Sequence, residues 1–126
     1  MNTTEIGRLG EAHAAKFLRK NKYKIVAKNV HESLNEIDII ARNKEYIVFV
    51  EVKTRSVNTD GELMFGTPAT AVTHEKQRRT IQAARSFLLF NNYPDLQPRF
   101  DVIEIYLCKA TGKPLHINHI INAFQA

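Results

Sequence analysis

The sequence predicts a single α/β domain over residues 1–126, with a central mixed β-sheet flanked by helices in the chain order α-β-β-β-α-β. Three observations support this fold class. A helical pattern comes first, three strand-like segments follow it, and a second helical pattern then precedes another apolar strand-like segment. A chain of 126 residues is long enough to bury one core but short for two.

The composition is that of an ordinary globular protein with a basic charge. Hydrophobic residues make up 44% of the chain and charged residues 25%, and 18 Lys and Arg against 13 Asp and Glu leave a net charge of +5. This excess suits a nucleic-acid partner without requiring one. Cys108 is the only cysteine, which excludes an internal disulfide and a cysteine-based zinc site. Because the chain shows neither a signal peptide nor a bilayer-length apolar run, we expect a cytoplasmic protein without membrane contact.

The first helix is expected to begin at Thr3 or Thr4, either of which can cap it, and to run to about Asn21. One face of this helix is small and apolar apart from a single acid. It consists of Glu11, Ala14, Ala15 and Leu18, at positions i, i+3, i+4 and i+7. A carboxylate among small and apolar side chains is unusual for a charge that is only solvated.

Three strands are expected at about residues 23–30, 36–42 and 46–54. The second and third are joined so tightly that they should pair antiparallel. Because side chains alternate along a strand, Glu36 and Asp38 share one face of the second strand. Glu51 and Lys53 likewise share one face of the third strand.

Whether these charged side chains meet depends on the turn between the two strands. A two-residue turn at residues 43–44 pairs Asp38 with Phe49, whereas a four-residue loop pairs Asp38 with Glu51. Both registers place Asp38, Glu51 and Lys53 on one face. A three-residue loop would place them on opposite faces, because a slip by one residue reverses every side chain.

The second half of the chain begins with residues 56–72, whose length without a regular pattern is typical of a functional or mobile loop. Thr73 is expected to cap a second helix that runs to about Phe90. Residues 99–107 read as a fourth strand. Residues 115–124 are expected to form a short strand that leads into a terminal helical turn.

Asp101 is interpreted as a structural residue, and the two histidines near the C-terminus are not interpreted as a metal site. Asp101 is expected to pair with Arg99 or to hold a helix end. His116 and His119 have helical i, i+3 spacing, but no third ligand lies nearby in the sequence, so a zinc site is not expected there.

The acids of the second and third strands suggest a chemistry. Carboxylates that share one place repel each other unless a cation lies between them, and oxygen ligands suit Mg²⁺ or Mn²⁺. Such an ion can polarise a phosphodiester and activate water, while a neighbouring lysine stabilises charge on phosphate. The alternative is that Glu51 and Lys53 form an ordinary ion pair on a solvated sheet surface.

At these residues the chain resembles known families. Asp38 followed by Glu51-Val52-Lys53 resembles the Asp…Glu-x-Lys motif of restriction-endonuclease-like nucleases. Nearly the whole chain resembles the YraN-type family of uncharacterised bacterial proteins, which is similar to Holliday junction resolvases. The blocks that carry this second resemblance are Gly7-Arg8-Leu9-Gly10-Glu11, Glu36-Ile37-Asp38-Ile39-Ile40-Ala41, Phe49-Val50-Glu51-Val52-Lys53-Thr54-Arg55, Phe65-Gly66-Thr67-Pro68, Lys76-Gln77-Arg78-Arg79 and Arg99-Phe100-Asp101-Val102.

The resemblance implies a role for each matching residue. Asp38 and Glu51 would bind Mg²⁺ or Mn²⁺, with the carbonyl of Val52 as a third ligand, and Lys53 would be the catalytic lysine. Glu11 would approach the metal from the first helix, and Gln77 would point at it from the second. From the sequence alone, Gln77 could instead be a buried amide that is hydrogen-bonded to the backbone. Glu36 could be an accessory acid beside Asp38 or an exposed residue at the strand start.

Basic and aromatic residues are candidates for nucleic-acid contacts. Four cations could bind phosphates, although such a cluster on a helix is often only a solvated face: Arg55, Lys76, Arg78 and Arg79. Tyr23, Tyr46 and Phe65 could stack on bases, with core or rim packing as the alternative.

Three functions remain open from the sequence. The first is a Mg²⁺- or Mn²⁺-dependent endonuclease that hydrolyses DNA, with branched and single-stranded DNA as candidate substrates. The second is a nucleic-acid-binding protein that keeps the nuclease fold without cleaving, and the third is a scaffold for a protein partner. Because junction-cutting relatives need two active sites, the resemblance also implies a homodimer.

Overall fold

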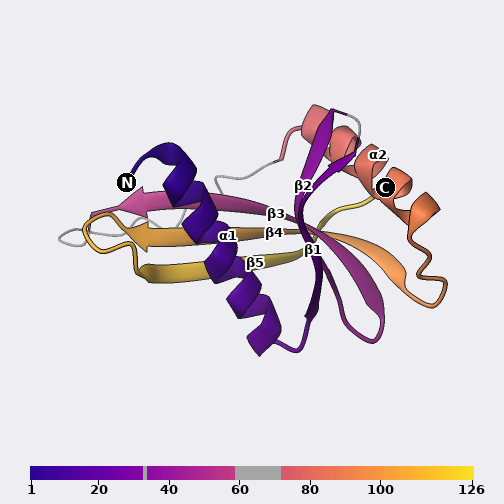
Figure 1. Cartoon of the computed structure of the whole chain (residues 1–126), viewed down its shortest axis with the longest axis horizontal. Helices are drawn as coiled ribbons and strands as arrows, with labels where there is room; N and C mark the ends of the chain where they lie inside the picture. The colour runs from indigo at the N-terminus through magenta and orange to yellow at the C-terminus, as the bar shows by residue number, and fades with distance from the viewer. Residues whose placement is uncertain (33, 59–71) are drawn as a thin grey trace.

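The computed structural model describes residues 1–32, 34–58 and 72–126, and it confirms the predicted α/β class (Figure 1). A five-stranded mixed sheet has the order β1-β2-β3-β4-β5, in which β3 and β4 are parallel and the other neighbours are antiparallel. The elements are α1 (Thr3–Lys20), β1 (Lys24–Glu32), β2 (Asn35–Arg42), β3 (Tyr46–Val57), α2 (His74–Phe90), β4 (Gln97–Cys108) and β5 (Pro114–Phe124).

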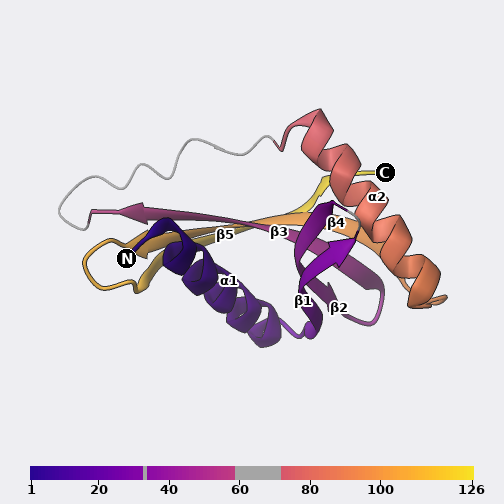
Figure 2. The ribbon, with the colours of Figure 1, turned by 45° about the horizontal axis from the view of Figure 1, so that its top comes forward.

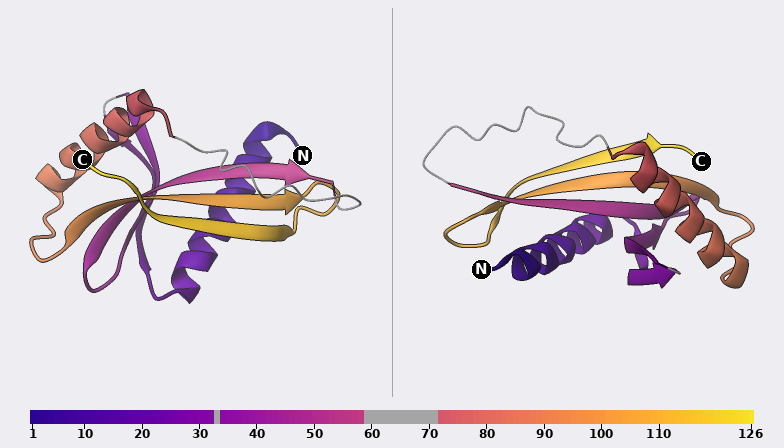
Figure 3. Two further views of the ribbon diagram at one scale, coloured as in Figure 1. Left: turned by 180° about the vertical axis from the view of Figure 1, so that it is seen from behind. Right: turned by 90° about the horizontal axis from the view of Figure 1, so that it is seen from above.

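The two helices lie on opposite faces of the sheet (Figure 3). Alternate residues of β3 serve the two faces, as the pleat requires. Phe49 packs with Phe87 of α2 in one core cluster, while Val48 and Val50 pack with Leu18 of α1 in the other. No helix in the described residues is long and apolar enough to cross a bilayer.

Helix α1 begins one residue earlier than the sequence indicated. Asn2, rather than Thr3 or Thr4, is the N-cap, and its side chain accepts a 2.8 Å hydrogen bond from the amide of Glu5. The carboxylate of Glu5 bonds back to the amide of Asn2, which completes a capping box. Asn is at least as good a cap as Thr, and starting at Asn2 places the acid at the position that closes the box.

Helix α1 approaches β3 very closely at Gly10. A Cβ atom at this position would lie 2.7 Å from the Cβ of Thr54, closer than two such atoms pack. The predicted small face is the buried one, because Gly10, Ala14, Ala15 and Leu18 are all buried. Small side chains therefore set the short distance between the helix and the sheet.

The turn between β2 and β3 gives the register of the four-residue loop. Arg42 pairs with Ile47 and Ile39 with Val50. The turn centres on residues 44–45 rather than on residues 43–44, because the amide of Asn43 bonds to the carbonyl of Tyr46. The Asn43 side chain also accepts from the amides of residues 45 and 46, an Asx turn that fixes this geometry.

Strands β2 and β3 diverge soon after this turn. Their pairing ends at Ile39 and Val50, whereas the parallel pairing of β3 with β4 continues over the full length from Tyr46 to Val57. The β1–β2 hairpin consequently turns away from the long β3–β4–β5 ribbon (Figures 1 and 2). We call the opening where β2 leaves β3 the strand fork.

The C-terminal segment differs from the expectation. It forms one continuous strand, β5, with no terminal helical turn, and it pairs antiparallel with β4 from Pro114 to Phe124. Gly112, at φ 74°, allows the preceding hairpin turn. Because β4 supplies a long row of backbone partners, pairing outweighs the weak local preference of this segment.

The expected connection at residues 56–72 is shorter at its start, since β3 continues to Val57. Residues 59–71, which include Phe65, lie outside the described residues. Helix α2 has the expected cap, with the amide of Lys76 bonded to the hydroxyl oxygen of Thr73 at 3.1 Å, and it ends at Phe90 as predicted.

Candidate functional site

The strand fork brings the predicted acids together. The residues of β2 before Ile39 are not paired with β3. The amide of Val52, which follows the last paired residue of β3, therefore has no backbone partner on β2. The carboxylate of Asp38 takes that place, accepting a 2.8 Å hydrogen bond from the Val52 amide. The separation of β2 from β3 thus both opens the fork and frees the backbone amide that holds Asp38 there.

Glu51 lies on the facing strand with two lysines beside it. Its side chain is only 12% exposed. The Nζ atom of Lys53 lies 3.9 Å from one carboxylate oxygen, and the Nζ atom of Lys76, at the start of α2, lies 3.6 Å from the other. The acid–acid–lysine set that the sequence predicted to share a face is therefore gathered in one place.

The two carboxylates disfavour each other's charge. Burial, and then the charge of Asp38, raise the pKa of Glu51, although Lys76 and Lys53 act in the opposite direction. Burial also raises the pKa of Asp38, against the hydrogen bond from Val52 and the two lysines. The described groups thus leave a deficit of positive charge, which an added cation at the fork would relieve.

Glu11 reaches the same region from α1. Its Oε1 atom is buried and has no hydrogen-bond partner, which is rare for a carboxylate oxygen. Burial and the charge of Asp38 raise the pKa of Glu11, while a hydrogen bond with Asn29 of β1 lowers it. A buried acceptor without a partner, close enough to sense Asp38, is the kind of group that a bound cation or its water would satisfy.

The donor set fits a small hard cation rather than a structural metal. In residues 1–32, 34–58 and 72–126 there is no group of three His, Cys, Asp or Glu side chains that could hold a metal ion. Mg²⁺, however, typically binds one or two carboxylates and keeps several waters. Asp38 and Glu51 could supply those carboxylates, and the orphaned oxygen of Glu11 could accept from a metal-bound water.

The structure also positions the remaining predicted site residues. The side chain of Gln77 donates to the carbonyl of Val72 at 2.8 Å, so its amide nitrogen serves the entry to α2. The amide of Val52 is bonded to Asp38, and its carbonyl belongs to the same strand segment. Glu36 is exposed but close enough to raise the pKa of both Glu11 and Asp38.

Of the four cations predicted to bind phosphate, the three arginines lie on the surface and the lysine lies beside Glu51. Arg78 and Arg79 are exposed on α2 and line a surface hollow with Leu34 and Asn35 near the β1–β2 turn. Arg79 is also paired with Glu75 at 2.6 Å. Arg55 is exposed on β3, two residues beyond Lys53.

Lys76 does not belong with those surface cations. Its predicted contact with phosphate stays a prediction, and the structure places its ammonium group 3.6 Å from the carboxylate of Glu51. One sequence signal pointed to an unusual role: a lysine in the first turn of a helix opposes the helix dipole. The sequence could not show that the start of α2 lies over β3.

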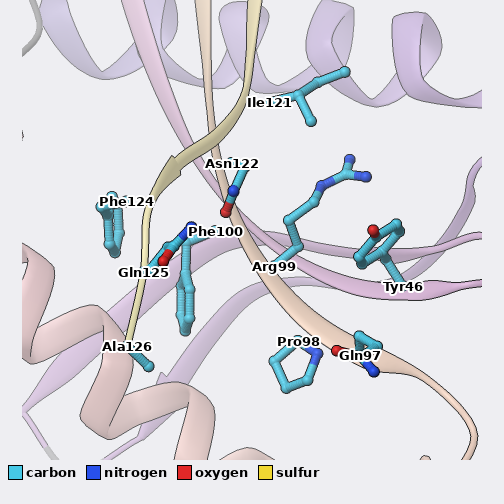
Figure 4. A pocket seen from close by; sticks show the side chains of 10 residues that line it. All are labelled: Tyr46, Gln97, Pro98, Arg99, Phe100, Ile121, Asn122, Phe124, Gln125 and Ala126. Carbon is cyan, nitrogen blue, oxygen red and sulfur yellow. The ribbon is translucent and has the colours of Figure 1, made fainter.

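A surface pocket of about 610 Å³ lies away from the fork, beside Arg99 (Figure 4). Arg99, which lines it, donates two hydrogen bonds to Asp101 and one to the hydroxyl of Tyr23, and it stacks on the ring of Tyr46. The predicted pairing of Asp101 with Arg99 is confirmed. His119 also contacts Asp101 at 2.7 Å, so this cluster uses its charges internally.

The two histidines of β5 do not form a joint site. His116 pairs with Tyr106 and His119 with Ile103 along the β4–β5 ladder. Residues three apart on a strand point to opposite faces, which separates the two imidazoles.

Together, the fold and the fork define an α/β protein whose mixed sheet holds a half-buried carboxylate pair flanked by two lysines. The chain belongs to the uncharacterised protein family UPF0102, whose model matches residues 10–105, and this confirms the YraN-type resemblance. It is 44% identical over 125 residues to a UPF0102 protein of Caldanaerobacter subterraneus subsp. tengcongensis, covering 98% of each chain. It is 40% identical over 124 residues to one of Clostridioides difficile, covering 98% of this chain and all of that one.

Proposed function

We propose that this protein is a Mg²⁺- or Mn²⁺-dependent nuclease that hydrolyses phosphodiester bonds of DNA at the strand fork. The observation that carries the proposal is the convergence of Asp38 and Glu51, with Lys53 at 3.9 Å from Glu51, where β2 leaves β3. The basic net charge of +5 and the exposed arginines of α2 support a polyanionic substrate. Branched and single-stranded DNA are the candidate substrates.

Asp38 and Glu51 would hold the metal, with the carbonyl of Val52 as a further candidate ligand. When bound, a divalent ion supplies Lewis-acid polarisation of the phosphate and lowers the pKa of a bound water. Hydrolysis adds the water oxygen to phosphorus, breaks the bond from phosphorus to the ester oxygen, and leaves a proton on the departing oxygen.

The protein's own groups act around that exchange. The Val52 amide keeps the Asp38 carboxylate in place without a rotamer search, since the hydrogen bond exists before substrate arrives. Lys53 is 37% exposed at its side chain, so its ammonium group can turn from Glu51 towards a phosphate oxygen. Glu11 can accept a hydrogen bond from water through its orphaned oxygen.

The test is a cleavage panel of duplex, single-stranded, flap and four-way-junction DNA, with Mg²⁺, with Mn²⁺ and with chelator. Wild-type protein should cut at least one substrate only with metal. Asp38→Asn and Lys53→Ala should each lower the rate by about 10²- to 10³-fold. Lys16→Ala, at an exposed position of α1, is the matched control and should cut normally.

The rival proposal is a DNA-binding protein without cleavage. It would be favoured if wild-type protein bound DNA with a steep salt dependence and cut nothing with either metal. Equal cutting by wild type and Asp38→Asn would remove the fork as the active site.

A further inference from the structure

Lys76 is placed where a lysine is costly. It lies in the first turn of α2, whose N-terminus carries a partial positive charge, and its own amide is bonded to the cap residue Thr73. The cost is offset by Glu51, whose carboxylate lies 3.6 Å from the Lys76 ammonium group. The side chain reaches from the helix across to β3 to make this contact.

Lys76 is the nearer of the two cations to Glu51. Glu51 has one lysine at each oxygen, with Lys76 at 3.6 Å and Lys53 at 3.9 Å, and Lys76 lowers the pKa of Glu51 more than Lys53 does. Lys76 likewise acts on Asp38 more strongly than Lys53. Lys53, the lysine of the sequence motif, is therefore the more distant of the two, and the nearer lysine comes from α2.

We propose that Lys76 is the resident counter-ion of the Asp38–Glu51 pair, that a divalent cation displaces its ammonium group, and that the released group then contacts a phosphate of the substrate. This inference rests on the proposed function, because it concerns the same carboxylates. The inference assigns Lys76 as a substrate-binding residue whose ammonium group becomes available when the metal is bound.

The exchange follows from charge and reach. An ammonium group and a divalent cation on one carboxylate repel each other, so occupancy by one disfavours the other. The Lys76 side chain is 38% exposed and carries a flexible four-carbon stem, which allows it to leave Glu51 without unfolding α2. Arg79, three residues further along α2 and therefore on a neighbouring part of the helix surface, is exposed, and a second cation there favours an anion even though Glu75 pairs with it.

The first experiment measures Mn²⁺ binding alone, from the electron paramagnetic resonance signal of free Mn²⁺. Lys76→Gln should bind Mn²⁺ about tenfold more tightly than wild type, equivalent to about 1.4 kcal/mol, because the competing cation is gone. Lys76→Arg keeps the charge and should stay within about twofold of wild type. Lys16→Gln, an exposed lysine of α1, is the control and should not change the affinity.

The second experiment measures binding of a labelled phosphorothioate oligonucleotide by fluorescence anisotropy. With chelator, where Lys76 is held by Glu51, wild type and Lys76→Gln should bind equally. With Mn²⁺, wild type should bind several-fold more tightly than Lys76→Gln, since only then is an extra ammonium group available to phosphate.

Two results would overturn the inference: an unchanged or weaker Mn²⁺ affinity in Lys76→Gln, or a gain in Lys76→Arg equal to that in Lys76→Gln. Either could occur in a protein that still cleaves DNA, and the proposed function would then stand alone. If Mn²⁺ affinity rises as expected but no DNA is cut, the counter-ion role stands and the nuclease proposal fails.

Discussion

The amide of Val52 and the carboxylate of Asp38 are joined by a 2.8 Å hydrogen bond that closes the gap between two diverging strands. Asp38 therefore has two tasks, since it satisfies a backbone donor and presents a charge to the fork. These tasks respond differently to substitution. An amide side chain can still accept from Val52, whereas an alanine cannot.

Asp38→Asn should be more stable than wild type in chelator, by on the order of 1 kcal/mol, because burial raises the pKa of this carboxyl and its charge opposes Glu51. Asp38→Ala should be less stable than Asp38→Asn by about 1 to 3 kcal/mol, since it leaves the Val52 amide without a partner. Urea unfolding followed by circular dichroism measures both. A stability of Asp38→Asn below that of wild type would contradict the proposed charge deficit.

Glu11→Gln should separate stability from metal binding. Removing this charge, whose pKa is raised by desolvation and by Asp38, should stabilise the metal-free protein. The same change should weaken Mn²⁺ binding several-fold, because a metal-bound water loses a charged acceptor. The control is Lys16→Gln, an exposed position on the same helix. Glu5→Gln is unsuitable because Glu5 closes the capping box. Unchanged Mn²⁺ affinity would place Glu11 outside the metal site.

Asp101 should give the protein an acid-sensitive element. Burial would raise its pKa, but hydrogen bonds from His119, Arg99 and the amide of Asn122 outweigh burial and lower it. A depressed folded-state pKa means that the stabilisation is complete above the unfolded-state value and is lost as the pH falls through the folded-state value. Wild type should therefore lose stability below about pH 4.

The matched variant for this element is Asp101→Asn. It should be less stable than wild type at pH 7 by about 3 kcal/mol, because it leaves the buried Arg99 without its anion. The difference between the two proteins should shrink on acidification, as Asp101 of wild type becomes neutral. A constant difference from pH 7 to pH 3 would show that the charge of Asp101 is not what stabilises the cluster.

Arg78 and Arg79 should contribute unequally to DNA affinity. Both are exposed on α2, but Arg79 is held by Glu75 at 2.6 Å, whereas Arg78 lines two neighbouring surface hollows. Arg78→Ala should weaken binding more than Arg79→Ala and should reduce the salt slope by about 1. Anisotropy titrations at several salt concentrations would measure this. Equal, negligible effects would remove this face of α2 from the DNA path.

Local sequence was sufficient to predict the two helices, the first four strands and the shared face of the strand acids. Alternation along two short strands placed Asp38, Glu51 and Lys53 on one face, and a tight turn made their antiparallel pairing the natural choice. The apolar face around Glu11 was equally visible, because Ala14 and Ala15 recur at helical spacing.

The rest depends on contacts that are distant in sequence. The fork arises because β3 continues along β4 after leaving β2, and no local pattern in β3 announces that choice. Lys76 lies beside Glu51 although the two residues belong to different elements and are 25 positions apart in the sequence. The strand at Pro114–Phe124 exists because β4 offers it a complete set of backbone partners, which outweighs its weak local preference.

Gly10 affects how closely Glu11 can approach the acids of the sheet. The gap between α1 and β3 at this point has room for a hydrogen atom but not for a methyl group, because Thr54 stands opposite. Glu11 is the next residue along the helix, so the distance from Glu11 to the fork depends on how closely Gly10 lets α1 approach β3. Any side chain at position 10 would push α1 away from β3 and move Glu11 away from Asp38, so the fork could be altered without changing a charged residue.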